Sequence, residues 1–239
     1  MNTVLFDLDG TLLPMDLDAF MKAYFGKIAP RAAKAGYDPK AFTEALLAGL
    51  YTVIKGGGEM TNEDCFWTTF AKLLGEDILA KKPMFEEFYQ NEFCEIGALF
   101  PADPLAKTCV KRLKEKGYTV VLATSPLYPR VATLERCRWA GIDPADFALV
   151  TTYEDYCYAK PHPEYYKEVL RRIGKEPQDC LMVGNDMIED GAAHKLGTDI
   201  FYLTDFLINK NGEDVTVYKH GKMADLLAFI EALPDAEVL

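Results

Sequence analysis

A short apolar stretch near the start of the chain runs directly into two acidic residues, in the order Val4-Leu5-Phe6-Asp7-Leu8-Asp9-Gly10. The stretch is too short for a helix and predicts a strand buried on both faces, as in a parallel sheet. Ligands bind at the carboxyl ends of such strands, so we expect Asp7 and Asp9 to face a crevice, with Gly10 turning the chain away. Two neighbouring carboxylates repel each other unless a cation lies between them, which points to Mg²⁺. The alternative is a turn with two solvated aspartates.

The composition predicts a folded protein with an acidic surface. The chain has 239 residues, 49% of them hydrophobic, and 26 Lys and Arg against 37 Asp and Glu give a formal charge of −11. This length allows one large α/β domain, or a core with a smaller companion. The negative charge disfavours nucleic acid and anionic membranes as partners. A small phosphorylated metabolite remains compatible with it, because a metal and local groups set the field at a site.

The cysteines give no sign of a metal site or a disulfide framework. They are widely spaced and contain no C-x-x-C pair: Cys65, Cys94, Cys109, Cys137, Cys157 and Cys180. The chain enters its first strand without a leader-like segment, and no apolar run approaches membrane-spanning length. We therefore expect a soluble, cytoplasmic protein, either a monomer or a weak homodimer.

Residues 15–99 read as a small helical bundle inserted between the first two strands. Apolar residues recur at helix spacing, and Asp38-Pro39 and Thr61 are typical helix starts. We predict a helical cap domain at 15–99 and a catalytic core at 1–14 and 100–239. Several aromatic residues in the cap have helical spacing, which favours a bundle core over a substrate pocket: Phe66, Trp67, Phe70, Phe85, Phe88, Tyr89 and Phe93.

From residue 101 onward, strands and helices alternate. Strands are expected at 118–123, 147–150, 180–183 and 200–203, with helices between them and a helix at 126–139 after the second strand. Residues 215–217 are a candidate for one more short strand. This alternation predicts the α/β class, with a doubly wound, Rossmann-like parallel sheet.

Polar residues follow several of these strands, and the topology places them on one edge of the sheet. They are Asp7 and Asp9, Thr124 with Ser125, Lys160, and Asn185-Asp186 with Asp190. Phosphoryl transfer requires such a group, with a nucleophile, donors for phosphate oxygens, a cation and metal ligands.

In order and spacing, these segments resemble the four motifs of the haloacid dehalogenase-like hydrolase superfamily. The matching stretches are Asp7-Leu8-Asp9-Gly10-Thr11, Thr124-Ser125, Ala159-Lys160-Pro161-His162-Pro163, and Met182 to Asp190. Most members transfer phosphoryl groups through an aspartyl-phosphate. The resemblance implies that Asp7 is the nucleophile, that Asp9 is the general acid and base, and that Thr124 and Lys160 complete the catalytic set. It assigns phosphate binding to Thr124, Ser125, Lys160 and Gly10.

The fourth segment departs from the commonest family pattern, in which Asp directly follows Gly. Here Asn185 takes that place and Asp186 follows it. The metal ligands implied are Asp7, the backbone carbonyl of Asp9 and one or more residues of this segment. We rank Asp186 first, Asp190 next as a second ligand or as an anchor for Lys160, and Asn185 third.

The resemblance implies a Mg²⁺-dependent phosphatase that acts on a small phosphomonoester, with the cap closing over the site. Family members that cleave carbon–halogen bonds generally lack an acid at the position of Asp9, so this residue favours phosphate chemistry. Two alternatives stay open, a sugar phosphomutase with the same intermediate and a non-catalytic protein that binds a phosphorylated ligand.

Overall fold

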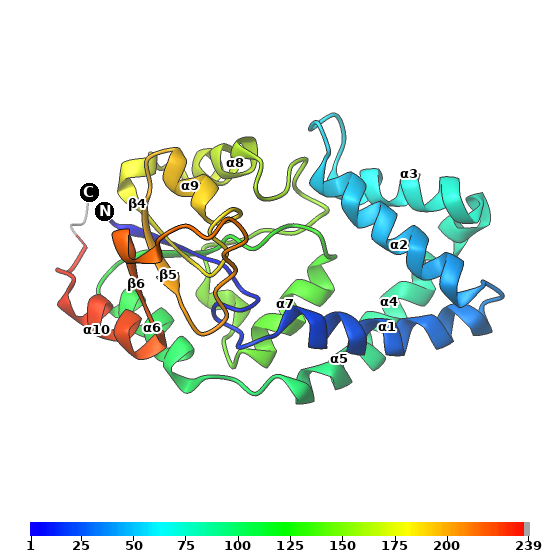
Figure 1. Cartoon of the computed structure of the whole chain (residues 1–239), viewed down its shortest axis with the longest axis horizontal. Coiled ribbons are helices and arrows are strands. Elements are labelled where there is room, and N and C mark those ends of the chain that lie inside the picture. Colours follow the sequence, from blue (N-terminus) through cyan, green and yellow to red (C-terminus); the bar gives the residue numbers. More distant parts are fainter. Residues whose placement is uncertain (237–239) are drawn as a thin grey trace.

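A single six-stranded parallel sheet forms the centre of the chain, in the order β3-β2-β1-β4-β5-β6 (Figure 1). The computed structural model describes residues 1–236. The strands are β1 Thr3–Phe6, β2 Thr119–Leu122, β3 Leu149–Val150, β4 Cys180–Gly184, β5 Asp199–Leu203 and β6 Lys219–Gly221. β1 pairs with both β2 and β4, so the first strand of the chain is central in the sheet. The predicted α/β class and parallel sheet are confirmed.

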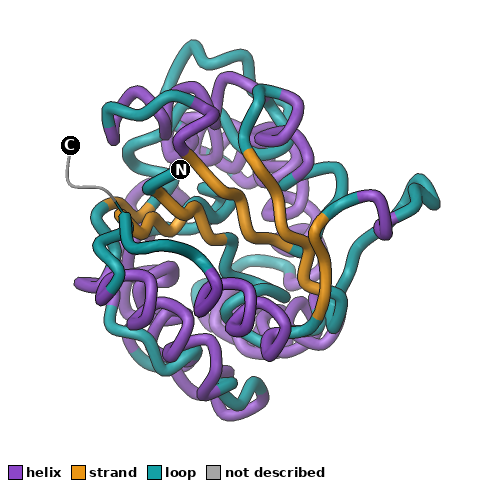
Figure 2. Tube along the Cα trace, turned by 90° about the vertical axis from the view of Figure 1, so that its left-hand side faces the viewer, coloured by secondary structure: helices purple, strands orange, loops and turns teal. Residues whose placement is uncertain are grey.

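Helices cover both faces of this sheet, as Figure 2 shows from the side. Phe6 faces a cluster that includes residues of α6 Pro104–Glu115, α7 Arg130–Trp139 and α10 Met223–Ala232. Leu5 points to the other face, against α8 Pro163–Ile173 and α9 Gly191–Lys195. Adjacent strand residues point to opposite faces, so both positions must be apolar. This accounts for the unbroken apolar run that begins the chain.

Five helices, α1 to α5, follow β1 and precede α6, and we call this group of helices the cap. They are α1 Leu17–Lys34, α2 Pro39–Ile54, α3 Asn62–Leu74, α4 Lys82–Gln90 and α5 Glu92–Ile96. Asp16, Asp38 and Thr61 cap the first three helices, each accepting a backbone N–H bond three residues on. The cap lies beyond the end of β1 (Figure 1).

The start of α3 attaches the cap to the core. The side-chain amide of Asn62 donates to the carbonyls of Pro126 at 3.1 Å and Tyr158 at 3.2 Å. Its backbone N–H donates to the carbonyl of Tyr156, and the next N–H, of Glu63, donates to Tyr153. Asn62 is only 1% exposed, so these bonds are shielded from water. They join the cap to the loops that follow β2 and β3.

Two predicted elements differ from the observed ones. α7 begins at Arg130 rather than at residue 126, because Pro126 and Pro129 interrupt the segment and Leu127 bonds back to Ser125 instead. Residues 215–217 form a 3₁₀ turn, and the additional strand is β6, which pairs with β5. Within residues 1–236, no helix combines the length and apolar character that crossing a membrane requires.

Candidate active site

Asp7 lies directly after β1, at the carboxyl end of the sheet. Its N–H donates to the carbonyl of Val183 and continues the pairing of β1 with β4. The chain then turns back, with φ of +78° at Gly10 and a bond from the Gly10 N–H to the carbonyl of Leu13. That bond occupies the Gly10 N–H, so the residue shapes the turn and does not offer this donor to a phosphate. A Cβ at Gly10 would lie 2.4 Å from Nδ2 of Asn185.

Lys160 joins two of the carboxylates. Its Nζ lies 2.8 Å from Oδ1 of Asp7 and 2.7 Å from Oδ1 of Asp190, and the side chain is 1% exposed. Burial alone would lower the pKa of Lys160, but the carboxylates of Asp190 and Asp7 raise it well above its usual value. Two carboxylates thus stabilise the positive charge of Lys160 beside Asp7.

Asp190 is fully engaged by donors from the protein. Oδ1 accepts the bond from Lys160, and Oδ2 accepts the backbone N–H groups of Asn185 and Asp186 at 3.0 and 2.9 Å. This close approach requires a glycine at 184, where a Cβ would lie 2.1 Å from Oδ2 of Asp190. Of the two roles expected for Asp190, the geometry favours the anchor for Lys160.

Asn185 and Asp186 have different environments. Oδ1 of Asn185 accepts a 3.0 Å bond from the hydroxyl of Thr11, and its Nδ2 donates to the carbonyl of Phe206. Oδ1 of Asp186 accepts the N–H groups of Ile188 and Glu189, at 2.7 and 2.9 Å. These bonds hold the Asp186 carboxylate in place through Oδ1, and Oδ2 takes no part in them.

The oxygen atoms at this edge fit a magnesium ion. Among residues 1–236 there is no group of three or more His, Cys, Asp or Glu side chains arranged to hold a metal. Mg²⁺ does not require one, because it is usually bound by one or two carboxylates together with waters and substrate phosphate. The Asp7 carboxylate, the Asp9 carbonyl and Oδ2 of Asp186 match that donor set.

Thr124 and Ser125 lie at the end of β2, as predicted. The carbonyl of Thr124 accepts bonds from the hydroxyls of Thr151 at 2.6 Å and Tyr165 at 2.8 Å, which fixes this turn. Oγ of Ser125 is buried and has no hydrogen-bond partner within the described chain. Because buried polar atoms are rarely left unpaired, this hydroxyl is available to a ligand oxygen.

Arg136 is a site residue that the sequence analysis missed. It lies on α7, is 1% exposed, and its guanidinium forms an ion pair with Oδ2 of Asp9. Oδ1 of Asp9 is buried and has no partner among residues 1–236. Burial raises the pKa of Asp9, although the Arg136 guanidinium opposes the shift. The helical spacing of Arg136 relative to Ala132 and Cys137 could have predicted it, because it places this arginine on the buried face of α7.

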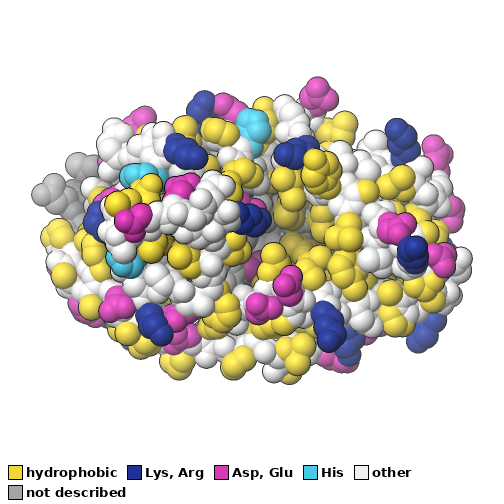
Figure 3. Space-filling view, viewed as in Figure 1, with side chains coloured by type: hydrophobic (Ala, Val, Ile, Leu, Met, Phe, Trp, Pro, Cys, Tyr) yellow, Lys and Arg dark blue, Asp and Glu magenta, His cyan; other side chains and the backbone are white. Residues whose placement is uncertain are grey.

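A hollow separates the core from the cap, and hydrophobic side chains gather on its cap side (Figure 3). Asp7, Lys160 and the Thr124-Ser125 pair lie at the carboxyl end of the sheet, which this cap adjoins.

The chain is similar to known proteins of one family. A family model described as haloacid dehalogenase-like hydrolase matches residues 1–197. The chain is 24% identical over 237 residues to a pyrophosphatase PpaX of Bacillus pumilus, covering 97% of each chain. It is 27% identical over 202 residues to a phosphoglycolate phosphatase of Pasteurella multocida, covering 83% of this chain and 84% of that protein.

Solved structures share the fold. A HAD phosphatase from Thermococcus onnurineus superimposes with a TM-score of 0.59 at 20% identity, covering 99% of this chain and 100% of the other. An L-2-haloacid dehalogenase from Xanthobacter autotrophicus gives the same TM-score at 16% identity, with 98% and 99% covered. Since the family model extends over most of the chain and ends within the segment after Asp190, this protein belongs to the haloacid dehalogenase-like hydrolases.

Proposed function

We propose that the chain is a Mg²⁺-dependent phosphatase that hydrolyses a small phosphomonoester through an aspartyl-phosphate on Asp7. The observation that carries this proposal is the contact between Asp7 and Lys160, in which a carboxylate lies beside a buried cation at the carboxyl edge of the sheet. Relatives named as a pyrophosphatase and a phosphoglycolate phosphatase support phosphate as the group transferred.

In the first step, a carboxylate oxygen of Asp7 attacks phosphorus and the bond to the leaving alcohol oxygen breaks. An alkoxide is a poor leaving group, so Asp9 donates a proton to that oxygen as the bond breaks. Oδ1 of Asp9 has no hydrogen-bond partner within the described residues 1–236, and Oδ2 is held by Arg136, so one oxygen is fixed and the other can carry the proton.

Charge on the phosphate is balanced by groups that are already in place. Lys160 offsets the repulsion between the Asp7 carboxylate and the incoming anion. The hydroxyls of Thr124 and Ser125 would donate to phosphate oxygens. Asp7, the Asp9 carbonyl and Asp186 would hold Mg²⁺, which would supply further charge neutralisation.

In the second step, water attacks the phosphorus of the aspartyl-phosphate, the bond from phosphorus to the Asp7 oxygen breaks, and inorganic phosphate leaves with the Asp7 carboxylate restored. Asp9, now without its proton, accepts a proton from that water. The same residue thus acts as acid and then as base, which regenerates the starting enzyme.

The test is hydrolysis of p-nitrophenyl phosphate with and without Mg²⁺ by the wild type, Asp7→Asn, and the exposed control Asp18→Asn. We expect metal-dependent release that only Asp7→Asn abolishes, and an acid-quenched wild type phosphorylated on the peptide that contains Asp7. Phosphorylation that is lost slowly to water and rapidly to a sugar phosphate would instead select a phosphomutase. A folded wild type that hydrolyses neither p-nitrophenyl phosphate nor a small alkyl phosphate, and does not become phosphorylated, would overturn the proposal.

A further inference from the structure

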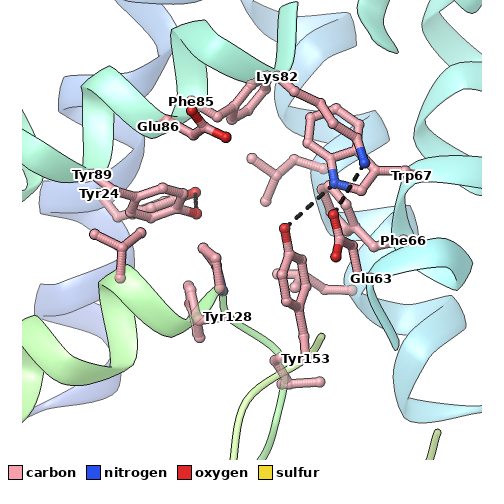
Figure 4. A pocket seen from close by; sticks show the side chains of 15 residues that line it. Tyr24, Glu63, Phe66, Trp67, Lys82, Phe85, Glu86, Tyr89, Tyr128 and Tyr153 are labelled. Atoms are coloured by element: carbon pink, nitrogen blue, oxygen red, sulfur yellow. Dashed lines mark hydrogen bonds and ion pairs between the residues drawn. The ribbon is translucent and has the colours of Figure 1, made fainter. Parts of the chain in front are cut away.

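An aromatic cavity of about 80 Å³ lies between the cap and the core (Figure 4). Cap helices α1 to α4 form most of its wall, and the loop after β2 and Tyr153 close it from the core. Seven aromatic side chains line it: Tyr24, Phe66, Trp67, Phe85, Tyr89, Tyr128 and Tyr153. Four of these come from the group that the sequence pattern assigned to a bundle core. They are buried in the cap and also form the surface of this cavity.

The cavity adjoins the reaction centre through Tyr128. The guanidinium of Arg136 lies 4.5 Å from the centre of the Tyr128 ring and forms the ion pair with Asp9. Leu127, also on the wall, donates its N–H to the carbonyl of Ser125. One side of the cavity is thus built from neighbours of the acid Asp9 and of the phosphate-binding turn. The alcohol part of a phosphomonoester bound at Asp7 would extend toward this cavity.

Several polar atoms of the wall bond to one another. The hydroxyls of Tyr24 and Tyr89 lie 2.9 Å apart, and Nε1 of Trp67 donates to the hydroxyl of Tyr153 at 3.4 Å. Figure 4 shows these pairs on opposite sides of the space. The surface left for a ligand is mainly the faces and edges of aromatic rings, which suits carbon groups.

The charges on the wall disfavour an anionic group. Its charged residues are Glu63, Lys82 and Glu86, two carboxylates and one ammonium. Nζ of Lys82 lies 3.1 Å from Oε1 of Glu63 and 4.9 Å from the centre of the Trp67 ring, so this cation is already paired. Glu86 adds a carboxylate at the exposed rim. A second anion entering the cavity would meet repulsion without an unpaired cation among the wall residues.

We propose that this cavity receives the alcohol part of the substrate and favours a compact alcohol without negative charge. This inference rests on the proposed function. Glu63 is the residue that determines this preference, because it neutralises Lys82. A cavity of about 150 Å³ can hold benzene, so a space of 80 Å³ suits a group of roughly three or four heavy atoms. The substrate class is a small aliphatic phosphomonoester whose alcohol is uncharged.

Three substrates of similar size test the preference: isobutyl phosphate, glycolamide phosphate and phosphoglycolate. The last two differ mainly in an amide against a carboxylate. We expect the wild type to have a kcat/KM for each uncharged substrate that is roughly tenfold or more above that for phosphoglycolate. Equal values, or a preference for phosphoglycolate, would overturn the inference while leaving the proposed phosphatase intact.

The Glu63→Gln variant tests the residue itself. It frees Lys82, so we expect the ratio of phosphoglycolate to glycolamide phosphate hydrolysis to rise roughly tenfold. Adding Lys82→Met to this variant removes the gain, and Glu59→Gln, on the exposed loop before α3, leaves the ratio at the wild-type value. An unchanged ratio in folded Glu63→Gln would show that Glu63 does not set the selectivity.

Binding provides a readout that does not depend on turnover. In a Trp139→Phe background, the remaining tryptophan is Trp67 on the cavity wall, since the chain has two. We expect its fluorescence to report tighter binding of the isobutyl phosphonate analogue than of the carboxylate-bearing analogue. If no ester is hydrolysed, p-nitrophenyl phosphate included, the proposed function fails. The ratio of the two analogues' binding affinities still decides the charge preference in that case. Equal binding of the two analogues would overturn it.

Discussion

The ammonium of Lys160 lies 2.8 Å from Oδ1 of Asp7, although 153 residues separate them in the chain. The sheet brings them together, because Asp7 ends the central strand β1 and Lys160 lies in the loop between β3 and α8. Asp190 fixes the lysine from its other side. The proposed nucleophile and the cation beside it are therefore part of one buried ion network.

Replacing Lys160 by Met should affect both turnover and stability. The substitution removes the cation beside the nucleophile, so we expect kcat to fall by about 100-fold or more. It also leaves the buried Asp190 carboxylate without its partner, which should lower the free energy of unfolding by about 3 kcal/mol. Steady-state kinetics and urea unfolding measure the two effects. Lys167→Met, at a side chain that is 55% exposed, is the matched control, and wild-type turnover in Lys160→Met would contradict the role.

Arg136→Met should impair the step that needs a proton. Without the guanidinium, Asp9 loses the group that fixes one of its oxygens, and we expect kcat to fall roughly 10- to 100-fold on an alkyl phosphate. The loss should be smaller on p-nitrophenyl phosphate, whose leaving group needs little protonation.

Arg138→Met is the control for this variant, since Arg138 lies on the same helix with a side chain that is 58% exposed. Partial recovery in Arg136→Lys would support charge-assisted positioning. An equal loss on both esters would indicate a general disturbance of the site and would refute the positioning role.

Substituting Asp186 and substituting Asp190 should have different effects on the Mg²⁺ concentration that the enzyme requires. Asp186→Asn removes a candidate ligand oxygen, so the Mg²⁺ concentration for half-maximal activity should rise about tenfold or more. Asp190→Asn should instead lower kcat and stability with a smaller change in the Mg²⁺ requirement, because its oxygens already hold protein donors. Titration of the EDTA-treated enzyme with Mg²⁺ measures both. The opposite pattern would exchange the roles assigned to the two residues.

Asn62→Ala should loosen the attachment of the cap. The variant loses two side-chain bonds to core carbonyls and leaves both carbonyls unpaired, which should cost about 1–3 kcal/mol of stability. Limited proteolysis should cut the segments joining cap and core faster than in the wild type. Asn91→Ala, which removes an exposed bond within the cap, should keep the wild-type cleavage rate, and a matching rate in Asn62→Ala would argue against the tether.

The cysteines should divide into two reactivity classes. Burial raises the pKa of Cys109, Cys137 and Cys180 to about 12, so they stay protonated and shielded at pH 8. Cys65, Cys94 and Cys157 are only partly buried. Titration of the native protein with a thiol reagent should label no more than the second group quickly, and urea should expose all six. Rapid native labelling of Cys137 would contradict the packing around α7.

The local signals in the sequence predicted several elements of the core and of the cap well. The run Val4-Leu5-Phe6 identified the central strand, and the helix starts at Asp38 and Thr61 match observed caps. Local signals failed at α7, where two prolines delay the helix. They also failed at residues 215–217, where three β-branched residues did not decide between strand and turn. Strand pairing is non-local, so β6 could be identified only by its contact with β5.

The sequence alone determined the parallel sheet and the acids, hydroxyls and lysine at its carboxyl edge, because strand ends are fixed by nearby residues and parallel strands share one direction. Only the tertiary structure decided which oxygens are free. Backbone N–H groups donate to Asp190, and Glu63 pairs with Lys82 in the cavity wall. The Arg136 guanidinium pairs with Asp9, although 127 residues separate them in the chain. These contacts join segments far apart in the chain, and their strength depends on burial, which a linear pattern of residues does not specify.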